Sequence, residues 1–165
     1  MTMKKLLLVI YGFLLLGCKI NEELLKIDEK VNTIESGIPL YEAMKKDFSV
    51  DGIKCGYMLI YFDSDQLVKM EKLYFGDLGK MKIIDYFENG FSILRCTDEE
   101  IKYSKKIEQY LDEPVYRKTK IYYSRNYPIK CIINNKNISV LSDEFIDIII
   151  MHNEFQKRYM KFEQE

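Results

Sequence analysis

Short apolar runs rich in Tyr and Phe, separated by turn signals, occupy most of the chain between residues 54 and 141 and constrain its fold more than any other feature. Asn89-Gly90 lies between two such runs and is the strongest short-range signal for a β-hairpin. Strands joined by tight turns pair with their neighbours, so the pattern predicts an antiparallel meander of about six or seven strands. The expected strands are 54–62, 67–75, 80–87, 91–96, 115–124, 129–133 and 138–141.

Pairs of adjacent aromatic residues recur along these runs, each followed by a turn and a new apolar strand. The pairs are Tyr61-Phe62, Tyr74-Phe75, Tyr86-Phe87 and Tyr122-Tyr123. Each unit is one strand plus one turn, which is too short for a solenoid repeat. We expect the aromatic side chains to pair across strands, at a few tenths of a kcal/mol to about 1 kcal/mol each.

Helical periodicity flanks the sheet on both sides. Apolar residues spaced four and three apart predict an amphipathic helix at about 20–36, and a short helical piece is expected at 40–46. Thr97-Asp98-Glu99-Glu100 has the form of a capping box and predicts a short helix over 97–111. Ser142 is the expected cap of a last helix at about 142–163. The sequence therefore predicts an α+β fold in which the N- and C-terminal helices pack on one face of the sheet.

Residues 1–17 have the layout of a secretory signal peptide, with Lys4 and Lys5 before an apolar run and Gly17 at its end. The apolar run is about 12 residues long, or roughly 18 Å of helix, whereas the hydrocarbon core of a bilayer is roughly 30 Å thick. A signal peptide is therefore favoured over a membrane-spanning helix.

The end of this segment, Leu15-Leu16-Gly17-Cys18, resembles the lipobox of bacterial lipoproteins. The resemblance implies that Cys18 is the lipid attachment site, carries acyl chains such as palmitate and becomes the new N-terminus after cleavage. It divides the chain into a signal peptide, 1–17, and a single α+β domain, 18–165. Lys19 follows the cysteine, and by the same resemblance it favours the outer membrane if the host has two membranes.

The strand region resembles a group of exported bacterial proteins that carry Tyr-Phe pairs before Asn-Gly-type turns. The matching residues lie within 56–96 and are Tyr61-Phe62, Leu67-Val68-Lys69, Tyr74-Phe75-Gly76 and Tyr86-Phe87-Glu88-Asn89-Gly90, with Tyr122-Tyr123 beyond them. The resemblance concerns fold and turns, so it transfers no activity. The chain departs from the pattern at 125–128, where a turn glycine is expected.

Charge and cysteine content restrict the function classes. Residues 1–17 hold two of the 25 basic residues and none of the 26 acidic ones, so the rest of the chain has a formal charge of −3. Without a basic patch, a nucleic-acid partner is disfavoured. If Cys18 is lipidated, Cys55, Cys96 and Cys131 remain, an odd number that allows at most one disulfide. We interpret these three as structural.

Residues that could carry chemistry do not form a recognisable catalytic or metal-binding pattern. His152, the only histidine, lies on the apolar side of the last predicted helix and is interpreted as a core residue. Asp63-Ser64-Asp65 begins like a calcium loop, but Leu67 and Val68 occupy positions that need a ligand and a glycine. The carboxylates at 98–100 are explained by a helix N-terminus. We expect no enzyme activity and no cofactor.

The sequence is compatible with three functions. The first is a membrane-anchored envelope lipoprotein with a non-catalytic role, whose exposed sheet face, carrying Tyr and Lys, contacts another envelope protein or a glycan. The second is an inhibitor or immunity-type lipoprotein that blocks a hydrolase, for which a projecting loop around 125–128 is expected. The third is an envelope hydrolase that uses carboxylates or a Cys-His pair.

Overall fold

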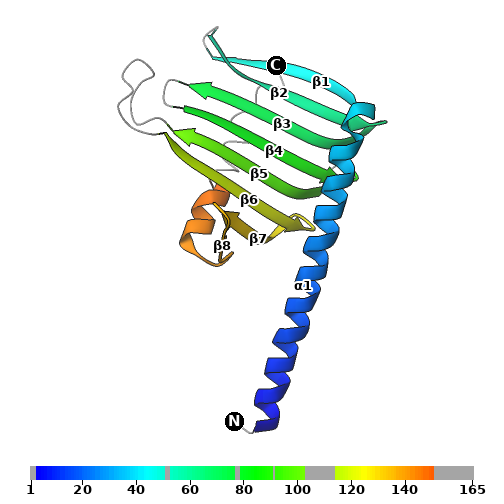
Figure 1. The fold of residues 1–165 in the computed structure, drawn as a ribbon, viewed down its shortest axis with the longest axis vertical. Helices are drawn as coiled ribbons and strands as arrows, with labels where there is room; N and C mark the ends of the chain where they lie inside the picture. Colours follow the sequence, from blue (N-terminus) through cyan, green and yellow to red (C-terminus); the bar gives the residue numbers. More distant parts are fainter. Residues whose placement is uncertain (1–2, 51–52, 77–78, 91, 103–113, 151–165) are drawn as a thin grey trace.

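Within the described residues, eight strands form one antiparallel meander in which every strand pairs with its neighbours in the sequence (Figure 1). The computed structural model describes residues 3–50, 53–76, 79–90, 92–102 and 114–150, and its description of side chains begins at Lys19. The strands are β1 Glu42–Val50, β2 Ile53–Asp63, β3 Gln66–Gly76, β4 Gly79–Glu88, β5 Ser92–Lys102, β6 Val115–Ser124, β7 Tyr127–Ile133 and β8 Lys136–Ile138. A helix α1, Met3–Gly37, and a 3-10 helix η1, Ile38–Leu40, precede the sheet, and a helix at 143–150 follows it.

Tight turns set the strand order, as predicted. Asn89 and Gly90 have φ values of 54° and 77° and close the β4–β5 hairpin. The β6–β7 turn consists of Arg125 and Asn126 alone, with φ of 49° and 67°. Two positive φ values in a row are those of a type I′ turn, which Asn tolerates and Arg rarely adopts. Arg125 therefore adopts a strained backbone conformation at a turn where a glycine was expected. The loop that was expected to project at 125–128 is only a two-residue turn.

The first strand is the main departure from the predicted strand count. A helical piece was predicted at 40–46, but this prediction was wrong, because β1 pairs along its length with β2, from Glu42 opposite Phe62 to Val50 opposite Ile53. β1 is an edge strand, and its Lys45, Lys46 and Asp47 are exposed. Charged residues on an edge strand oppose further pairing, and they also remove the apolar alternation by which a strand is recognised in a sequence.

The prediction of a helix beginning at Thr97 was also wrong. Residues 97–102 belong to β5, where Asp98 is opposite Ile83 and Thr119, and Glu99 is opposite Lys82 and Lys118. These cross-strand partners outweigh the local capping pattern. The rest of that predicted helix, residues 103–111, lies outside the described residues.

The last helix begins where the sequence predicted it. The backbone N–H of Phe145 donates a hydrogen bond to Ser142 Oγ, at 3.3 Å, and residues 143–150 are helical. Phe145 and Ile148 are buried, with 4% and 6% of their surface exposed. The remaining part of this predicted helix, including His152, lies outside the described residues.

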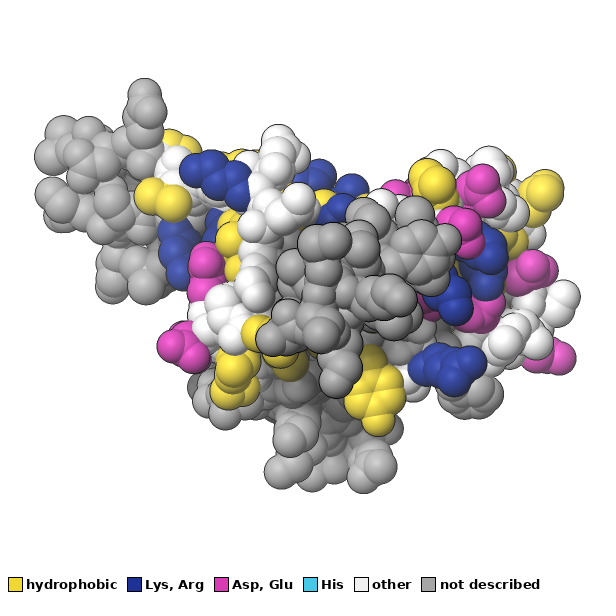
Figure 2. Space-filling model, turned by 90° about the horizontal axis from the view of Figure 1, so that it is seen from below, with side chains coloured by type: hydrophobic (Ala, Val, Ile, Leu, Met, Phe, Trp, Pro, Cys, Tyr) yellow, Lys and Arg dark blue, Asp and Glu magenta, His cyan; other side chains and the backbone are white. Residues whose placement is uncertain are grey.

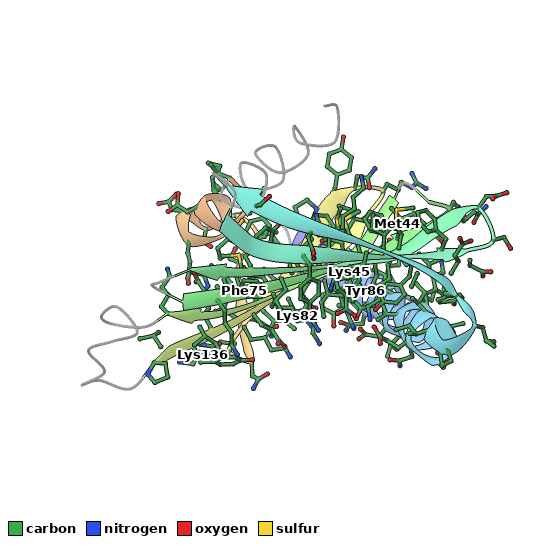
Figure 3. All side chains as sticks on the ribbon, turned by 90° about the horizontal axis from the view of Figure 1, so that it is seen from above. Met44, Lys45, Phe75, Lys82, Tyr86 and Lys136 are labelled. Carbon is green, nitrogen blue, oxygen red and sulfur yellow. The ribbon has the colours of Figure 1, made fainter. Side chains whose placement is uncertain are left out.

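The two helices lie on opposite faces of the sheet, so the prediction that both pack on one face was wrong (Figures 1 and 3). We call the face against α1 the front face and the face against helix 143–150 the back face. Apolar α1 residues Leu24, Ile27, Val31 and Ile34 pack on Tyr86, Leu94 and Tyr122 of the front face. Phe145 and Ile148 pack on the back face, against Ile83, Cys96, Ile121, Tyr123 and Cys131. Adjacent residues of a strand point to opposite faces, so the pair Tyr122-Tyr123 serves both cores.

Candidate functional surface

A row of alternating tyrosine and cationic side chains crosses the front face beneath α1. Each member lies opposite the next across neighbouring strands, and we call the row the cation–tyrosine ladder. Its members are Tyr61 in β2, Lys69 in β3, Tyr86 in β4, Arg95 in β5, Tyr122 in β6 and Lys130 in β7. Lys69 Nζ lies 5.3 Å from the Tyr61 ring centroid and 5.7 Å from that of Tyr86, and Arg95 Cζ lies 4.9 Å from the Tyr86 centroid. These distances are those of cation–π contacts.

Glu35 of α1 closes the ladder over β3 and β4. Lys69 Nζ lies 2.8 Å from Glu35 Oε1 and 2.7 Å from Glu71 Oε1, and the Tyr86 hydroxyl donates a 2.6 Å hydrogen bond to Glu35. The Lys69 side chain is only 3% exposed. Burial lowers the pKa of Lys69, but hydrogen bonds to the two carboxylates outweigh burial and raise this pKa above its usual value. The same contacts hold the pKa of Glu35 and Glu71 below their usual values, although burial opposes this shift.

Asp28 of α1 repeats this arrangement over β5 and β6. Arg95 Nη1 lies 2.7 Å from Asp28 Oδ1, and the Tyr122 hydroxyl donates to both carboxylate oxygens, at 3.1 and 3.2 Å. Burial and the hydrogen bond to Glu35 raise the pKa of Tyr86 to about 12, and burial and the neighbouring Asp28 raise the pKa of Tyr122. Both tyrosines therefore remain neutral hydrogen-bond donors at physiological pH.

The spacing of the two carboxylates on the helix matches the spacing of the strands. Asp28 and Glu35 are seven residues apart, or about 10.5 Å along a helix, and two strand intervals span about 9.5 Å. α1 runs across the strands (Figure 1), so Glu35 contacts β3 and β4 whereas Asp28 contacts β5 and β6. Between them, Lys30 forms an ion pair with Glu88 at the end of β4. These contacts fix both the position and the direction of α1.

Beyond the ladder, the front face carries aromatic and charged side chains that are partly exposed. Figure 3 shows Phe75, Lys82 and Tyr86 on the α1 side of the sheet and Met44 on the other. We define the open surface as Lys45, Tyr57, Phe75, Lys82, Tyr116 and Lys118. Phe75 and Tyr116 are 42% and 50% exposed, and the rings of Tyr57 and Phe75 lie 6.3 Å apart. Lys45 Nζ lies 4.9 Å from the Tyr57 ring centroid. Two of the lysines are paired, Lys82 with Glu71 at 3.0 Å and Lys118 with Glu99 at 2.5 Å.

The predicted lipid attachment site lies within α1. Cys18 is near the middle of this helix, and residues 19–22 after it are exposed. Leu24 is the first residue of α1 in the described core. No helix in the described part of the chain is long and apolar enough to cross a membrane.

The other described cysteines, Cys55, Cys96 and Cys131, form no disulfide, and Cys96 and Cys131 are buried. Cys96 and Cys131 both lie opposite Ile121, one on each side, so they are separated by two strand intervals. That is about 9.5 Å, beyond the roughly 7 Å limit for a disulfide. Burial raises the pKa of Cys131 to about 11 and raises that of Cys96 well above its usual value. A cysteine nucleophile must be ionised to react. Both thiols are protonated at neutral pH and therefore do not have this property.

The carboxylates at 98–100 take different positions. Asp98 and Glu100 belong to the back face and Glu99 to the front face, because they alternate along β5. Burial, helped by the neighbouring Glu100, raises the pKa of Asp98 to about 6. Among the described residues, no three His, Cys, Asp or Glu side chains come together as a metal site.

The sequence contained a signal for the ladder that the predictions did not use. Tyr61, Tyr86 and Tyr122 begin three of the four aromatic pairs, and each is followed eight or nine residues later by Lys69, Arg95 or Lys130 across a turn. The fourth pair differs, because its Tyr74 belongs to the back-face core. The partners on α1, Asp28 and Glu35, could not be assigned without knowing which face the helix covers.

Comparison with protein-family models, with curated proteins and with solved structures finds no match to this chain.

Proposed function

We propose that the protein is exported, is cleaved before Cys18 and is held at a membrane by acyl chains on that cysteine. One observation carries the proposal: residues 19–22 of α1 are exposed, and the part of the helix that packs on the sheet begins at Leu24, after Cys18. The first part of α1 extends past the sheet (Figure 1). Removal of residues 1–17 is therefore compatible with the described fold, and the fold does not conflict with the signal peptide expected from the sequence.

The energetics of lipid anchoring agree with a stable attachment. Burying acyl chains contributes about 0.8 kcal/mol per methylene, so one chain holds a protein weakly and two or three hold it firmly. Residues 19–23 separate the proposed anchor from the first buried residue, Leu24. At 1.5 Å per helical residue they form a link of about 9 Å, which keeps the sheet close to the lipid surface.

The mass of the protein purified from host membranes tests the anchor. For the wild type we expect a chain that starts at Cys18 and carries two or three acyl chains, and for Cys18→Ala an unmodified chain. A Cys96→Ala variant is the matched control, because it removes a buried thiol and should retain the acyl mass. An unmodified wild-type product would refute the proposal.

For the anchored domain we propose a non-catalytic binding role through the open surface, with a cell-wall glycan or another envelope protein as the partner. Exposed Phe75 and Tyr116 offer aromatic contact area, and the lysines around them offer hydrogen-bond donors. Sites with aromatic anchors and a polar rim are typical of binding surfaces.

Co-sedimentation with the purified cell-wall glycan of the host tests this role. We expect the wild type to sediment with the glycan and the double variant Phe75→Ser, Tyr116→Ser to stay in solution. The control is Val115→Ser, another exposed apolar residue at the start of β6. Equal sedimentation of wild type and double variant would contradict binding through this surface, and no sedimentation of any variant would leave a protein partner as the remaining form of the proposal.

A further inference from the structure

The cation–tyrosine ladder makes the direction of α1 a fixed property of the domain. Contacts with the sheet follow one another along the helix, from Glu35 over β3 and β4, through Lys30 at Glu88, to Asp28 over β5 and β6. A helix held at successive points over the strands cannot swing about a single hinge. If Cys18 is anchored in lipid, the same end of the sheet therefore always faces the lipid surface. The arrangement of α1 on the sheet shows which end this is.

The β6–β7 turn is the part of the sheet next to the anchor. Of the turns that lie along α1 in Figure 1, it is the one nearest the N-terminus. A groove of about 280 Å³ joins it to the helix, between Glu23 and Lys26 of α1 and Ser124 and Arg125 of the turn. Glu23 and Lys26 are five and eight residues after Cys18, or about 8 and 12 Å along the helix axis.

This end carries exposed apolar and aromatic side chains. Tyr127, directly after the turn, is 76% exposed, and Leu25 on α1 is 65% exposed. Ile20 continues the buried stripe of α1 toward Cys18 but is 42% exposed, because it precedes the part of the helix that packs on the sheet. Figure 2 views the molecule from this end, and the described side chains on it are basic, acidic and apolar ones interspersed, without a large block of one charge among them. Such a surface fits a zwitterionic lipid interface, where tyrosine is enriched.

We propose that this end of the domain rests on the membrane surface, with Tyr127 in the headgroup layer and the open surface of the front face held away from it. The inference rests on the proposed anchor at Cys18. A headgroup layer is about 5 to 7 Å thick on each side of the bilayer, so a turn packed against α1 at about 8 to 12 Å above Cys18 lies just outside this layer, within reach of a tyrosine side chain. The side chain of Tyr127 then extends into the layer, and Ile20 lies within it.

Tryptophan fluorescence tests this orientation, because the chain contains no Trp. Two single-tryptophan variants are compared, Tyr127→Trp at the proposed contact and Phe75→Trp on the open surface. Each is purified from host membranes as the mature full chain and reconstituted into phosphatidylcholine vesicles, with or without a nitroxide on the lipid headgroup. Flotation of the vesicles reports anchoring separately from the fluorescence.

We expect the nitroxide to remove more than half of the emission of the Tyr127→Trp protein and little of that of the Phe75→Trp protein. Adding Asp28→Asn and Glu35→Gln to Tyr127→Trp should reduce the quenching while the protein still floats, because the helix is no longer fixed on the sheet. Equal quenching at both positions, or none at either in a protein that floats, would overturn the orientation and leave the anchor intact. A protein that does not float with the vesicles would refute both the anchor and this inference.

Discussion

The two faces of the sheet hold their helices by different chemistry. On the back face, helix 143–150 packs through apolar side chains such as Phe145 and Ile148. On the front face, α1 combines an apolar stripe with charged contacts from Asp28, Lys30 and Glu35. Apolar packing has little directional preference, whereas hydrogen bonds and ion pairs require particular partners at particular distances. We infer that packing on the back face contributes mainly to the stability of the fold, whereas the contacts on the front face fix the orientation of α1 on the sheet.

Truncation of Phe145 should have the largest effect. Phe145→Ala removes a buried ring from the back-face core and should lower the free energy of unfolding by about 3 kcal/mol or more, measured by urea denaturation. Ile146→Ala is the control, since Ile146 is 48% exposed on the same helix and its loss should cost less than about 0.5 kcal/mol. Equal costs for the two changes would show that this helix does not pack as described.

Loss of the buried cation should be the next largest effect. Lys69→Met keeps the length of the side chain but leaves Glu35 and Glu71 without their shared partner. We expect a loss of about 2 to 3 kcal/mol in unfolding free energy, below the full cost of a buried pair because Glu35 is 42% exposed. The control Lys45→Met, at a side chain that is 54% exposed, should cost less than about 1 kcal/mol. A neutral Lys69→Met would mean that the ladder does not stabilise the fold.

The two faces should also respond to pH with opposite sign. Asp98 on the back face has a raised pKa of about 6, so between about pH 4 and 6 the folded state keeps a proton that the unfolded state has lost, and stability falls as pH rises. Asp98→Asn should abolish this fall, which we expect to be about 2 kcal/mol. Glu35 and Glu71 have lowered pKa values, so their contribution is lost as pH falls below their usual range. Urea titrations from about pH 6 down to about pH 3 would detect both effects. Parallel pH profiles of the wild type and Asp98→Asn would contradict the assignment to Asp98.

The smallest effect concerns direction more than stability. Asp28→Asn weakens the pair with Arg95 but can still accept from Tyr122, so we expect a loss of only about 1 kcal/mol. Glu29→Gln, at an exposed position one residue further along α1, is the matched control and should be neutral. Thermal denaturation of both variants would measure the difference, and an equal effect of the two would mean that Asp28 does not help to hold α1 on the ladder.

The sequence predicts the order of the strands better than the sides of the sheet. Turn residues such as Asn89 and Gly90 are local, and a short turn leaves no choice of neighbour, so the meander follows directly. Strand β1 was not predicted, because the charged residues Lys45, Lys46 and Asp47 of this exposed edge strand interrupt the apolar alternation by which a strand is recognised. The face of the sheet that each helix covers is not set by local sequence. The apolar stripe of a helix indicates that the helix packs on the sheet, but not on which face. Tyr122-Tyr123 offers an apolar side chain to both faces and leaves that choice open.

The candidate surface was predictable only in part. The sequence predicted exposed Tyr and Lys side chains on a sheet face without helices, whereas the open surface shares its face with α1. The role of Ser142 as a helix cap was predicted correctly. The error at Thr97-Asp98-Glu99-Glu100 has a physical cause, since a capping box is a local pattern and the pairing of Glu99 with Lys118 is a tertiary one. The proposed lipid site at Cys18 rests on the sequence motif, and the structure adds where the docked part of α1 begins.

Amide hydrogen exchange of the mature protein in detergent micelles tests most directly the claim that α1 is a docked, fixed helix only from Leu24 onward. We predict that the amides from Leu24 to Ile34 exchange as slowly as those of β5 and β6, while those of residues 19–23 exchange much faster. In the Asp28→Asn, Glu35→Gln double variant the protected part of α1 should become faster, with β5 and β6 little changed. Fast exchange along the whole of α1 in the wild type would contradict the account, because the helix would then not be held on the front face.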